Sequence, residues 1–599
     1  MGKKFLSLSN LNFLIWDVFK LDEILKHHYY RHQDKDAVNM MVDSAVKIAE
    51  KHLQPFMKEM DRNPPELVNG QIKSHPKISK LIKAMGDGGW YSATASMDEG
   101  GMQIPLMVDA VANLIFQAAN NGTYGFTGLN AGAANLISAF ASNELKEEYV
   151  PNLHSGKWQG TMALTEPDAG SSLGDIKSTA AATGEDGVYK IRGQKIFISA
   201  GDVEHVDNIV HMMLARIEGE PSGTKGISLF IVPKFRKEKN KNVSNDVKTA
   251  GIFHKMGQKA TPTVHLSMGD KKDCIGYLVG EKNQGLNYMF KLMNEARISV
   301  GIGAAAMASA AYYASLEYAN ERPQGRVKGE EKSEDQAMII EHADVKRMLL
   351  KQKAIVEGSI SLIIQCANFA DLVKTKEGDL RDHYQLLLDL LTPVVKTYPS
   401  ERGIESVSEA LQCLGGYGYT EDFELEQLYR DIRITPLYEG TTGIQSLDLL
   451  GRKVLMENGK AMQLLAKEFE FTVRDARYFE ELNDVVDPFI AGSDELKKVT
   501  HHLLSYAMNS KLDRFVADAT VYMEMFGLVC LGWQWLKQGV VVVDSCRKNV
   551  ENLENPFYLG KLHTMRYFFT YEYPRVYSLS ATLMNDNDLT LTVDKSWLN

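Results

Sequence analysis

The sequence contains few cysteines, no excess of basic residues and no long apolar run. Its five cysteines in 599 residues form neither a CxxC pair nor a zinc-type spacing, which predicts buried free thiols in a reducing compartment. The formal net charge is -10, whereas proteins that bind nucleic acid usually carry a basic face. No uninterrupted apolar stretch reaches the roughly 18 residues that a membrane span needs. We therefore expect a cytoplasmic protein with no nucleic-acid partner and no stable membrane insertion.

Motifs of several common enzyme classes are also missing. No G-x-S-x-G sequence occurs, so serine-hydrolase chemistry has no support. Residues 301–306 fit the G-x-G-x-x-A pattern of dinucleotide-binding turns, but they continue a helical pattern that begins near Leu286. Close helix packing is therefore the favoured interpretation of these small residues. His28 and His32 are spaced for one helix face, yet no third ligand is evident, so we predict no metal site.

Hydrophobic periodicity predicts several domains, as expected for 599 residues at about 100–200 residues per domain. A helical pattern dominates residues 36–153 and returns between 286 and about 456, and a further mostly helical stretch follows. Four short β-rich segments lie between them, at 188–199, 209–217, 227–233 and 263–268. The charged insertions at 236–248 and 324–335 are predicted to be solvent loops.

We therefore predict a fold that is mainly α with a central β domain. Alternating β-α-β units, which indicate a parallel sheet, are absent, so the β domain is expected to be antiparallel. The predicted parts are an N-terminal extension (1–35), a helical domain (36–158), a β domain (159–283), a helical bundle (284–458) and an additional helical C-terminal domain (459–599).

Three short segments have compositions suited to ligand binding. The first, residues 162–171, combines hydroxyls and small residues around a Pro turn, and its free backbone N–H groups suit a flavin edge or a pyrophosphate. A strand at 195–199 follows it, with an aromatic residue beside a hydroxyl. The second, 412–419, contains paired glycines that permit positive φ and the close approach of a phosphate or ribose. Each segment alone is more often a plain loop, a strand or a helix C-cap.

The third segment, residues 436–445, contains a lone carboxylate, Glu439, after an apolar stretch. A Gly turn and two threonines follow, and the threonines can cap a helix that begins near Ile444. Poor solvation of the carboxylate would raise its pKa toward neutrality, as a general base requires. In isolation, a Glu that accepts backbone hydrogen bonds in a turn is the more common case.

Together and in this order, the three segments resemble the acyl-CoA dehydrogenase family over residues 36–456. The resemblance implies a helical domain, an antiparallel β domain and a four-helix bundle, with FAD as cofactor and an acyl-CoA as substrate. It also implies roles for single residues. Those implied for the flavin are Met162, Leu164, Thr165, Ser171, Phe197, Ile198, Ser199, Thr441 and Thr442. Those implied for the phosphates and the ADP half of FAD are Arg322, Gln324, Gln412, Gly415 and Gly416. Those implied for substrate are Ser171, Arg297 and Gly440.

The chain departs from the family pattern at two of these places. Phe197 stands where Trp is usual, and Ser199 stands where Thr is usual, so stacking area is reduced while the hydroxyl is kept. The Phe-Gly pair that commonly follows the Arg-x-Gln motif is replaced by Gly325 and Arg326.

One comparison identifies the expected base. Some family members place the carboxylate immediately before the arginine that corresponds to Arg297, where this chain has Ala296. Alanine cannot abstract a proton, and Glu295 points about 100° away on a helix. The resemblance therefore implies that Glu439 removes the α-proton of the thioester, while FAD takes up the hydride from the β-carbon. Hydrogen bonds to the thioester oxygen, including one from the Glu439 N–H, would stabilise the developing enolate charge.

The length of the chain also indicates which branch of the family it resembles. Its extended ends look like the bacterial branch that contains 3-methylmercaptopropionyl-CoA dehydrogenases and certain long-chain acyl-CoA dehydrogenases. The implied partners are an electron-transfer flavoprotein and further copies of the chain, as a homodimer or homotetramer. Two alternatives remain open: an acyl-CoA oxidase that passes electrons to O₂, and a non-catalytic acyl-CoA-binding protein. The acyl chain length is not predicted.

Overall fold

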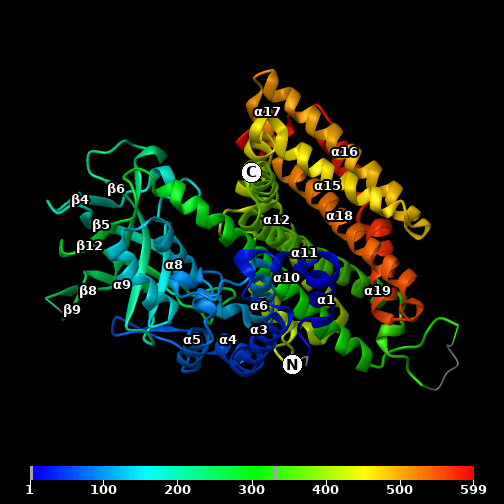
Figure 1. Ribbon diagram of the computed structural model, residues 1–599, viewed down its shortest axis with the longest axis horizontal. Helices are drawn as coiled ribbons and strands as arrows, with labels where there is room; N and C mark the ends of the chain where they lie inside the picture. The colour runs from blue at the N-terminus through cyan, green and yellow to red at the C-terminus, as the bar shows by residue number, and fades with distance from the viewer. Residues whose placement is uncertain (1–3, 240, 330–334) are drawn as a thin grey trace. The chain divides into compact units, whose positions relative to one another are not determined.

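The computed structural model describes residues 4–239, 241–329 and 335–599, apart from the side chains of 291–295. The chain forms two compact units (Figure 1). Asp36–Ala296 make up one of them, called the β unit below. Met1–Lys35 and Arg297–Asn599 make up the other, called the bundle unit. Residues 459–599, for which the sequence predicts a domain of their own, lie in the same compact unit as the bundle helices.

The helices of the β unit come first in the chain and cover part of its sheet. α8 packs directly on strand β3, because Gly160 brings the two backbones close: a Cβ at Gly160 would lie 2.5 Å from the Cβ of Ala133. α6 is buried along nearly its whole length, in keeping with its apolar sequence. The longer helices are α3 (Lys35–Ile48), α5 (Lys77–Asp87), α6 (Leu106–Asn120), α8 (Leu129–Phe140) and α9 (Asn143–His154).

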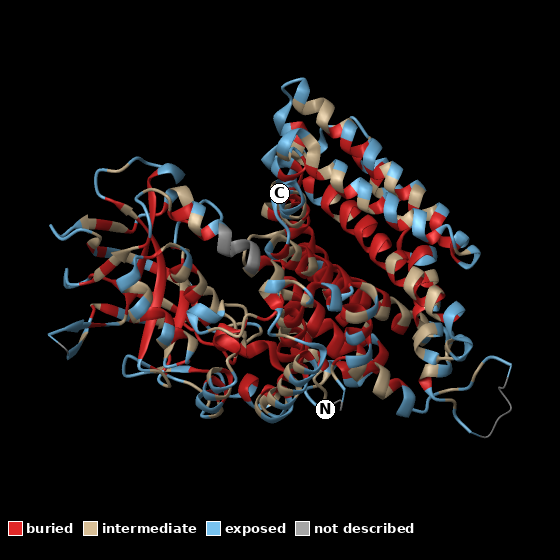
Figure 2. Ribbon diagram, viewed as in Figure 1, coloured by how far each residue is buried: buried red, intermediate tan, exposed pale blue. Residues whose placement is uncertain are grey.

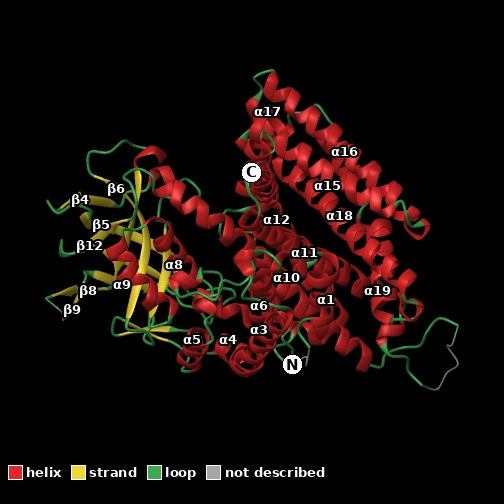
Figure 3. Ribbon diagram, viewed as in Figure 1, coloured by secondary structure: helices red, strands yellow, loops and turns green. Residues whose placement is uncertain are grey.

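An eight-stranded sheet forms the centre of the β unit, in the order β10-β11-β5-β12-β7-β6-β3, with β4 pairing to β5 and β6 (Figure 3). The four predicted strands are confirmed as β5, β6, β7 and β11. Most pairs are antiparallel as expected, but β3 and β4 each run parallel to β6. The strands are β3 (Trp158–Ala163), β4 (Thr179–Ala182), β5 (Val188–Ser199), β6 (Asn208–Ile217), β7 (Ile227–Pro233), β10 (Val247–Ile252), β11 (Thr263–Met268) and β12 (Ile275–Leu278).

The charged segment 236–248 is not a solvent loop, so that prediction is wrong. It forms the hairpin β8 (Phe235–Glu238) and β9 (Lys241–Ser244) and then enters β10. Its first arginine, Arg236, is buried, and the guanidinium lies 3.0 Å from the Asp273 carboxylate. A partner outside the segment, Asp273, therefore allows this charged sequence to form part of a hairpin. The second charged segment, 324–335, lies partly outside the described residues.

Three long helices form the core of the bundle unit: α10 (Gly285–Glu321, in this unit from Arg297 on), α11 (Ala343–Thr375) and α12 (Gly378–Leu414). The small residues at 301–306 lie inside α10, and a Cβ at Gly301 would come within 2.1 Å of the Val395 carbonyl oxygen on α12. This confirms close helix packing as the role of the G-x-G-x-x-A sequence. Two short helices follow α12: α13 (Leu425–Ile432) and α14 (Thr442–Asp448).

The C-terminal helices pack onto these long helices through α18 (Ala519–Lys548), which is buried along most of its length (Figure 2). The indole N–H of Trp535 donates to the Ala354 carbonyl oxygen on α11 at 3.1 Å. The N-terminal segment joins the same packing, because Phe13 meets Phe557 edge to face. The other C-terminal helices are α15 (Lys460–Ala476), α16 (Asn483–Met508), α17 (Leu512–Ala517), α19 (Pro556–Tyr567) and α20 (Arg575–Leu583).

Three helices are long and apolar enough, by length and composition alone, to cross a membrane: Ala296–Glu321, Ala343–Thr375 and Ala519–Lys548. Polar residues interrupt the apolar sequence of each of these helices, so none of them forms an uninterrupted apolar run. Between 72% and 83% of their apolar windows is buried inside the protein. Burial of this extent is typical of core helices in a large bundle.

Candidate functional site

The end of β3 and the loop after it carry the first group of predicted site residues: Met162 in the strand, and Leu164, Thr165 and Ser171 in the loop. A buried ion pair holds this loop against β5, since Lys195 Nζ lies 2.8 Å from Glu166 Oε1. The same ammonium donates to the Leu164 carbonyl oxygen at 2.9 Å, and the Ile196 N–H donates to that of Thr165 at 2.9 Å. The two segments that the sequence predicts as flavin contacts are therefore joined in the β unit.

Phe197 leaves β5 at a bulge. Lys195 pairs with Leu266 and Ile198 pairs with Val264, so two residues of β5 oppose the single residue His265 of β11. Phe197 takes a φ of 59° there, and 56% of it is exposed. Ile198 is buried in the core of the β unit, so its side chain is not available to a ligand. The bulge thus turns an aromatic ring outward, as a flavin-stacking role would require.

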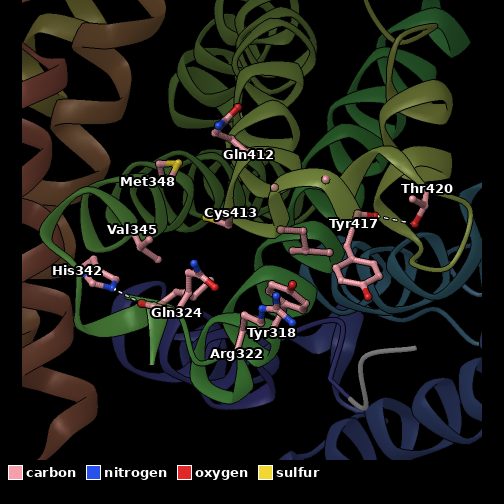
Figure 4. A pocket seen from close by; sticks show the side chains of 14 residues that line it. Tyr318, Arg322, Gln324, His342, Val345, Met348, Gln412, Cys413, Tyr417 and Thr420 are labelled. Atoms are coloured by element: carbon pink, nitrogen blue, oxygen red, sulfur yellow. Dashed lines mark hydrogen bonds between the residues drawn. The ribbon is translucent and has the colours of Figure 1, made fainter. Parts of the chain in front are cut away.

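A cavity of about 590 Å³ in the bundle unit brings together the second group of predicted residues (Figure 4). Such a volume is within the usual range for cofactor sites. Arg322 supplies a guanidinium suited to phosphate, 5.9 Å from the Tyr417 ring centroid. His342 donates from Nε2 to the Gln324 carbonyl oxygen at 2.7 Å. The lining includes the predicted residues Arg322, Gln324, Gln412, Gly415 and Gly416.

The two glycines of this cavity fit a ligand that approaches the backbone closely. Gly415 ends α12 with a φ of 57°, which favours glycine, so the helix C-cap interpretation also holds. A Cβ at either glycine would meet no atom of the described chain within 4 Å. Because packing within the chain does not require glycine at Gly416, the open space is suited to a bound group. The residues present therefore fit the ADP half of FAD.

Glu439 lies in a tight turn between α13 and α14, with a φ of 53°. This left-handed conformation is uncommon for a residue with a side chain, and such strain is often found at active sites. Gly440 has a φ of 86°, which favours glycine, and a Cβ there would lie 2.4 Å from Gln445 Nε2 and so displace that amide. Thr441 caps α14 by accepting the Ile444 N–H at 3.2 Å, which confirms the predicted cap.

Electrostatics at the turn suit a general base. Burial raises the pKa of Glu439 above its usual 4.5, and the positive charges of Lys396 and Arg297 act in the opposite direction. The net shift is upward, which is the direction that a general base requires. Burial also lowers the pKa of Lys396 to about 8, opposed by Glu401 and Glu439.

Arg297 projects from α10 within the same unit. It is buried, and its Nη1 lies 2.8 Å from Asp448 Oδ2 at the end of α14. Its Nε is also buried and has no hydrogen-bond partner among the described residues. A buried donor without a partner is costly unless a ligand accepts from it. Ala296 offers no carboxylate beside this arginine, and the side chain of Glu295 lies outside the description.

Several residues around these sites were not predicted. Lys396 and Gln445 bind carbonyl groups of the Glu439 turn, and Tyr318, His342 and Tyr417 line the cavity. Tyr417 and Gln445 lie inside the candidate segments 412–419 and 436–445, although the sequence assigned them no role. Lys396 also gave a signal, because it is the one charged residue in the apolar run 390–398. No group of three or more metal-ligating side chains occurs among the residues that the structure describes.

Comparisons with known proteins agree with this arrangement. Three family models match the acyl-CoA dehydrogenase N-terminal domain (35–157), middle domain (161–270) and C-terminal domain (283–455). A fourth, described as acetyl-CoA dehydrogenase C-terminal like, matches 465–594. The models leave little of the chain unmatched, and they include its C-terminal helices.

Two relatives and one solved structure are similar over most of the chain. The 3-methylmercaptopropionyl-CoA dehydrogenase of Ruegeria pomeroyi is 36% identical over 80% of this chain and 82% of its own length. A broad-specificity linear acyl-CoA dehydrogenase of Mycobacterium tuberculosis is 31% identical over 96% of this chain and 97% of its own. The acyl-CoA dehydrogenase of Bacillus anthracis complexed with FAD shares the fold, with a TM-score of 0.72 and 21% identity over 93% of this chain and 90% of that one.

These matches cover the β unit and the bundle unit alike. They also account for the predicted fold, a helical and β region followed by a bundle with an additional C-terminal part. The chain therefore belongs to the acyl-CoA dehydrogenase family of FAD-dependent oxidoreductases.

Proposed function

We propose that the protein oxidises an acyl-CoA thioester to the trans-2-enoyl-CoA, with Glu439 as the catalytic base. The observation that supports this most strongly is the Glu439 turn. It combines a strained φ of 53°, a carboxyl whose pKa is raised by burial, and a backbone N–H without an acceptor among the described residues. A base and a hydrogen-bond donor are thereby presented by one residue.

In the proposed mechanism, the Glu439 carboxylate removes the α-proton of the thioester and holds it. The Glu439 N–H donates to the thioester oxygen and stabilises the negative charge that develops there. Arg297 and Gly440 are proposed to contact the substrate, and the buried Arg297 Nε supports this because it lacks a partner within the described chain. FAD, when bound, accepts the hydride from the β-carbon.

We propose separate flavin contacts for each unit. In the bundle unit, Arg322 and Gln324 would bind phosphate, and Gln412, Gly415 and Gly416 would hold the ADP half. Thr441 and Thr442 would lie near the ring. In the β unit, the proposed contacts are Met162, Leu164, Thr165, Ser171, Phe197, Ile198 and Ser199. Ser171, which is exposed, would also approach the thioester.

The proposal extends to the partners and the compartment. The electron acceptor is proposed to be an electron-transfer flavoprotein, and the assembly a homodimer or homotetramer. Relatives that act on 3-methylmercaptopropionyl-CoA and on linear acyl-CoAs suggest a short or linear acyl group. All five cysteines are free and buried, which supports a reducing compartment such as the cytoplasm.

Anaerobic flavin bleaching tests the proposal. The holoenzyme is mixed without O₂ with butyryl-, octanoyl-, palmitoyl- or 3-methylmercaptopropionyl-CoA, and the flavin absorbance is followed. Bleaching by at least one thioester, with the enoyl-CoA as product, is expected; no bleaching by any of them contradicts the proposal. A parallel run in air measures peroxide. Rapid stoichiometric peroxide release would instead identify an oxidase.

A further inference from the structure

Lys396 is a lysine in the interior of the bundle unit. It lies on α12 with none of its surface exposed, and its Nζ donates to the Gly440 carbonyl oxygen at 2.9 Å. Among the described residues this ammonium has no carboxylate in contact and no second hydrogen bond, and Glu401 and Glu439 act on it only as more distant charges. Burying an ammonium without a counter-charge in contact is costly, so stability alone does not account for this residue.

The bond from Lys396 is one of several that hold the Glu439 turn. Gln445, also fully buried, donates from Nε2 to the Glu439 carbonyl oxygen at 2.9 Å. Two consecutive carbonyl groups are therefore bound from inside the bundle. Thr442 adds a hydrogen bond from its hydroxyl to the carboxylate of Glu401, five residues beyond Lys396 on α12. These bonds fix the peptide planes on both sides of the strained residue and leave the Glu439 N–H free within the described chain.

We propose that Lys396 is a positioning residue for the base: its ammonium holds the Gly440 peptide and so keeps the Glu439 carboxylate and N–H in their reactive orientation, with Gln445 as second support. This inference rests on the proposed role of Glu439. Lys396 itself touches neither substrate nor flavin in this scheme.

The other nearby cation, Arg297, is bound differently. Its guanidinium is paired with Asp448, which also accepts from Arg452 at 2.6 Å, so its charge is balanced by a carboxylate in contact. The charge of Lys396 has no such contact and acts on Glu401 and Glu439 from a distance. Lys396 thus keeps a positive charge behind the turn without neutralising the base.

Lys396→Met removes the charge and the donor at nearly constant volume, and Gln445→Leu removes the second support. We expect both holoenzymes to keep their FAD. The rate of flavin reduction at saturating butyryl-, octanoyl- or palmitoyl-CoA, whichever reduces the native flavin fastest, should fall by about 30- to 100-fold, as for a base displaced by about 1 Å. The melting temperature of Lys396→Met should stay the same or rise, because this substitution removes a buried charge that has no carboxylate in contact.

Lys561→Met is the matched control. Lys561 is an equally buried lysine of the bundle unit, but it pairs with Glu357 at 2.8 Å and lies far along the chain from the turn. This variant should show the opposite pattern, a lower melting temperature with a saturating rate within twofold of native. A Lys396→Met rate within threefold of native, or a rate loss that only accompanies an equal loss of stability and FAD, overturns the proposal.

Hydrogen exchange separates this inference from the proposed function. Peptides spanning residues 434–446 should exchange at least tenfold faster in Lys396→Met and in Gln445→Leu than in native enzyme, whether or not an acyl-CoA bleaches the flavin. Unchanged exchange overturns the positioning role even if bleaching is normal. Absence of bleaching in native enzyme contradicts the proposed function, while the exchange result still decides whether Lys396 holds the turn.

Discussion

Two buried lysines, one in each unit, are bound in opposite ways. In the β unit, Lys195 and Glu166 are in direct contact at 2.8 Å, and Glu166 also accepts the backbone N–H groups of Lys177 and Ser178. In the bundle unit, Lys396 binds a backbone carbonyl instead, and Glu439 is left without a cation in contact among the described residues. Lys195 and Glu166 thus form an ion pair in contact, which we call the closed pair, whereas Lys396 and Glu439 are not in contact.

The carboxyl groups differ accordingly. Burial alone would raise the pKa of Glu166. The charge and hydrogen bond of Lys195, together with the hydrogen bonds from Ser178 and Lys177, outweigh it, so its pKa is lowered. Burial raises the pKa of Glu439, and the more distant cations do not overcome it. Both lysines have pKa values lowered to about 8 by burial. Contact therefore favours the ionised form of Glu166, which holds a loop, whereas separation keeps Glu439 able to accept a proton.

The largest expected effect, on the rate of flavin reduction, comes from removing the Glu439 carboxylate. Glu439→Gln preserves the shape of the side chain and its backbone but cannot accept the α-proton. We expect FAD to stay bound and flavin reduction by acyl-CoA to slow by about 10⁴-fold, the upper end for loss of a general base. Stopped-flow bleaching under anaerobic conditions measures this. A variant that reduces its flavin at a near-native rate would move the base to another residue.

The next effect concerns the closed pair. Glu166→Gln leaves Lys195 buried without its counter-charge, and breaking such a pair costs about 3–5 kcal/mol. We expect a comparable loss in the free energy of unfolding of the β unit, measured by denaturant titration. We also expect a lower FAD content, measured by flavin absorbance. Asp168→Asn is the control in the same loop, because its ion pair with Lys177 is exposed. Equal stability of both variants would show that the closed pair has no structural role.

The sequence identified Glu439 and the strand that carries Lys195, but not the partners of the two buried lysines. Glu439 stands out as a lone carboxylate between an apolar run and a Gly-Thr-Thr turn, and strand periodicity identified β5, which carries Lys195. The partner of each lysine was not predictable in the same way. Lys195 meets a glutamate 29 positions earlier in the chain, whereas Lys396 meets a carbonyl 44 positions later, and only the packing of distant segments decides which.

Local patterns also failed where distant partners change the outcome. The segment 236–248 is charged enough for a solvent loop, yet Asp273 balances the charge of the buried Arg236, and Asn245 accepts a further hydrogen bond from it. The cavity shows the same limit. Gly415 and Gly416 were visible as a glycine pair, but Tyr318 and His342 come from other segments and carry no motif. Periodicity predicts elements well, and it carries little information on which side chains converge.

The pH dependence should distinguish the two glutamates. Glu439 must be ionised to act, so at saturating substrate the rate of flavin reduction should rise with pH, about tenfold per unit below a midpoint that lies above 4.5. For Glu166 the lowered pKa means that its stabilising effect is present above the unfolded value and is lost as pH falls through the folded pKa. Melting temperatures of native and Glu166→Gln enzyme should therefore converge in acid. A rate that does not vary with pH would contradict the assignment of Glu439.

The smallest expected effect, on FAD affinity, tests whether the space beside Gly416 in the cavity of the bundle unit holds the cofactor. A Cβ at Gly416 would meet no atom within 4 Å in the described chain, so Gly416→Ala should leave the unfolding of the apoprotein unchanged. If the ADP half of FAD lies against this backbone, the added methyl group should weaken FAD binding by about tenfold, or 1.4 kcal/mol. Fluorescence titration of apoprotein with FAD measures this, and Gly451→Ala, where a Cβ would lie 3.7 Å from Val516, serves as a control outside the cavity. Equal affinity in the two variants would mean that the open glycine faces solvent rather than cofactor, and the contrast with the closed β-unit loop would then rest on the Glu439 turn alone.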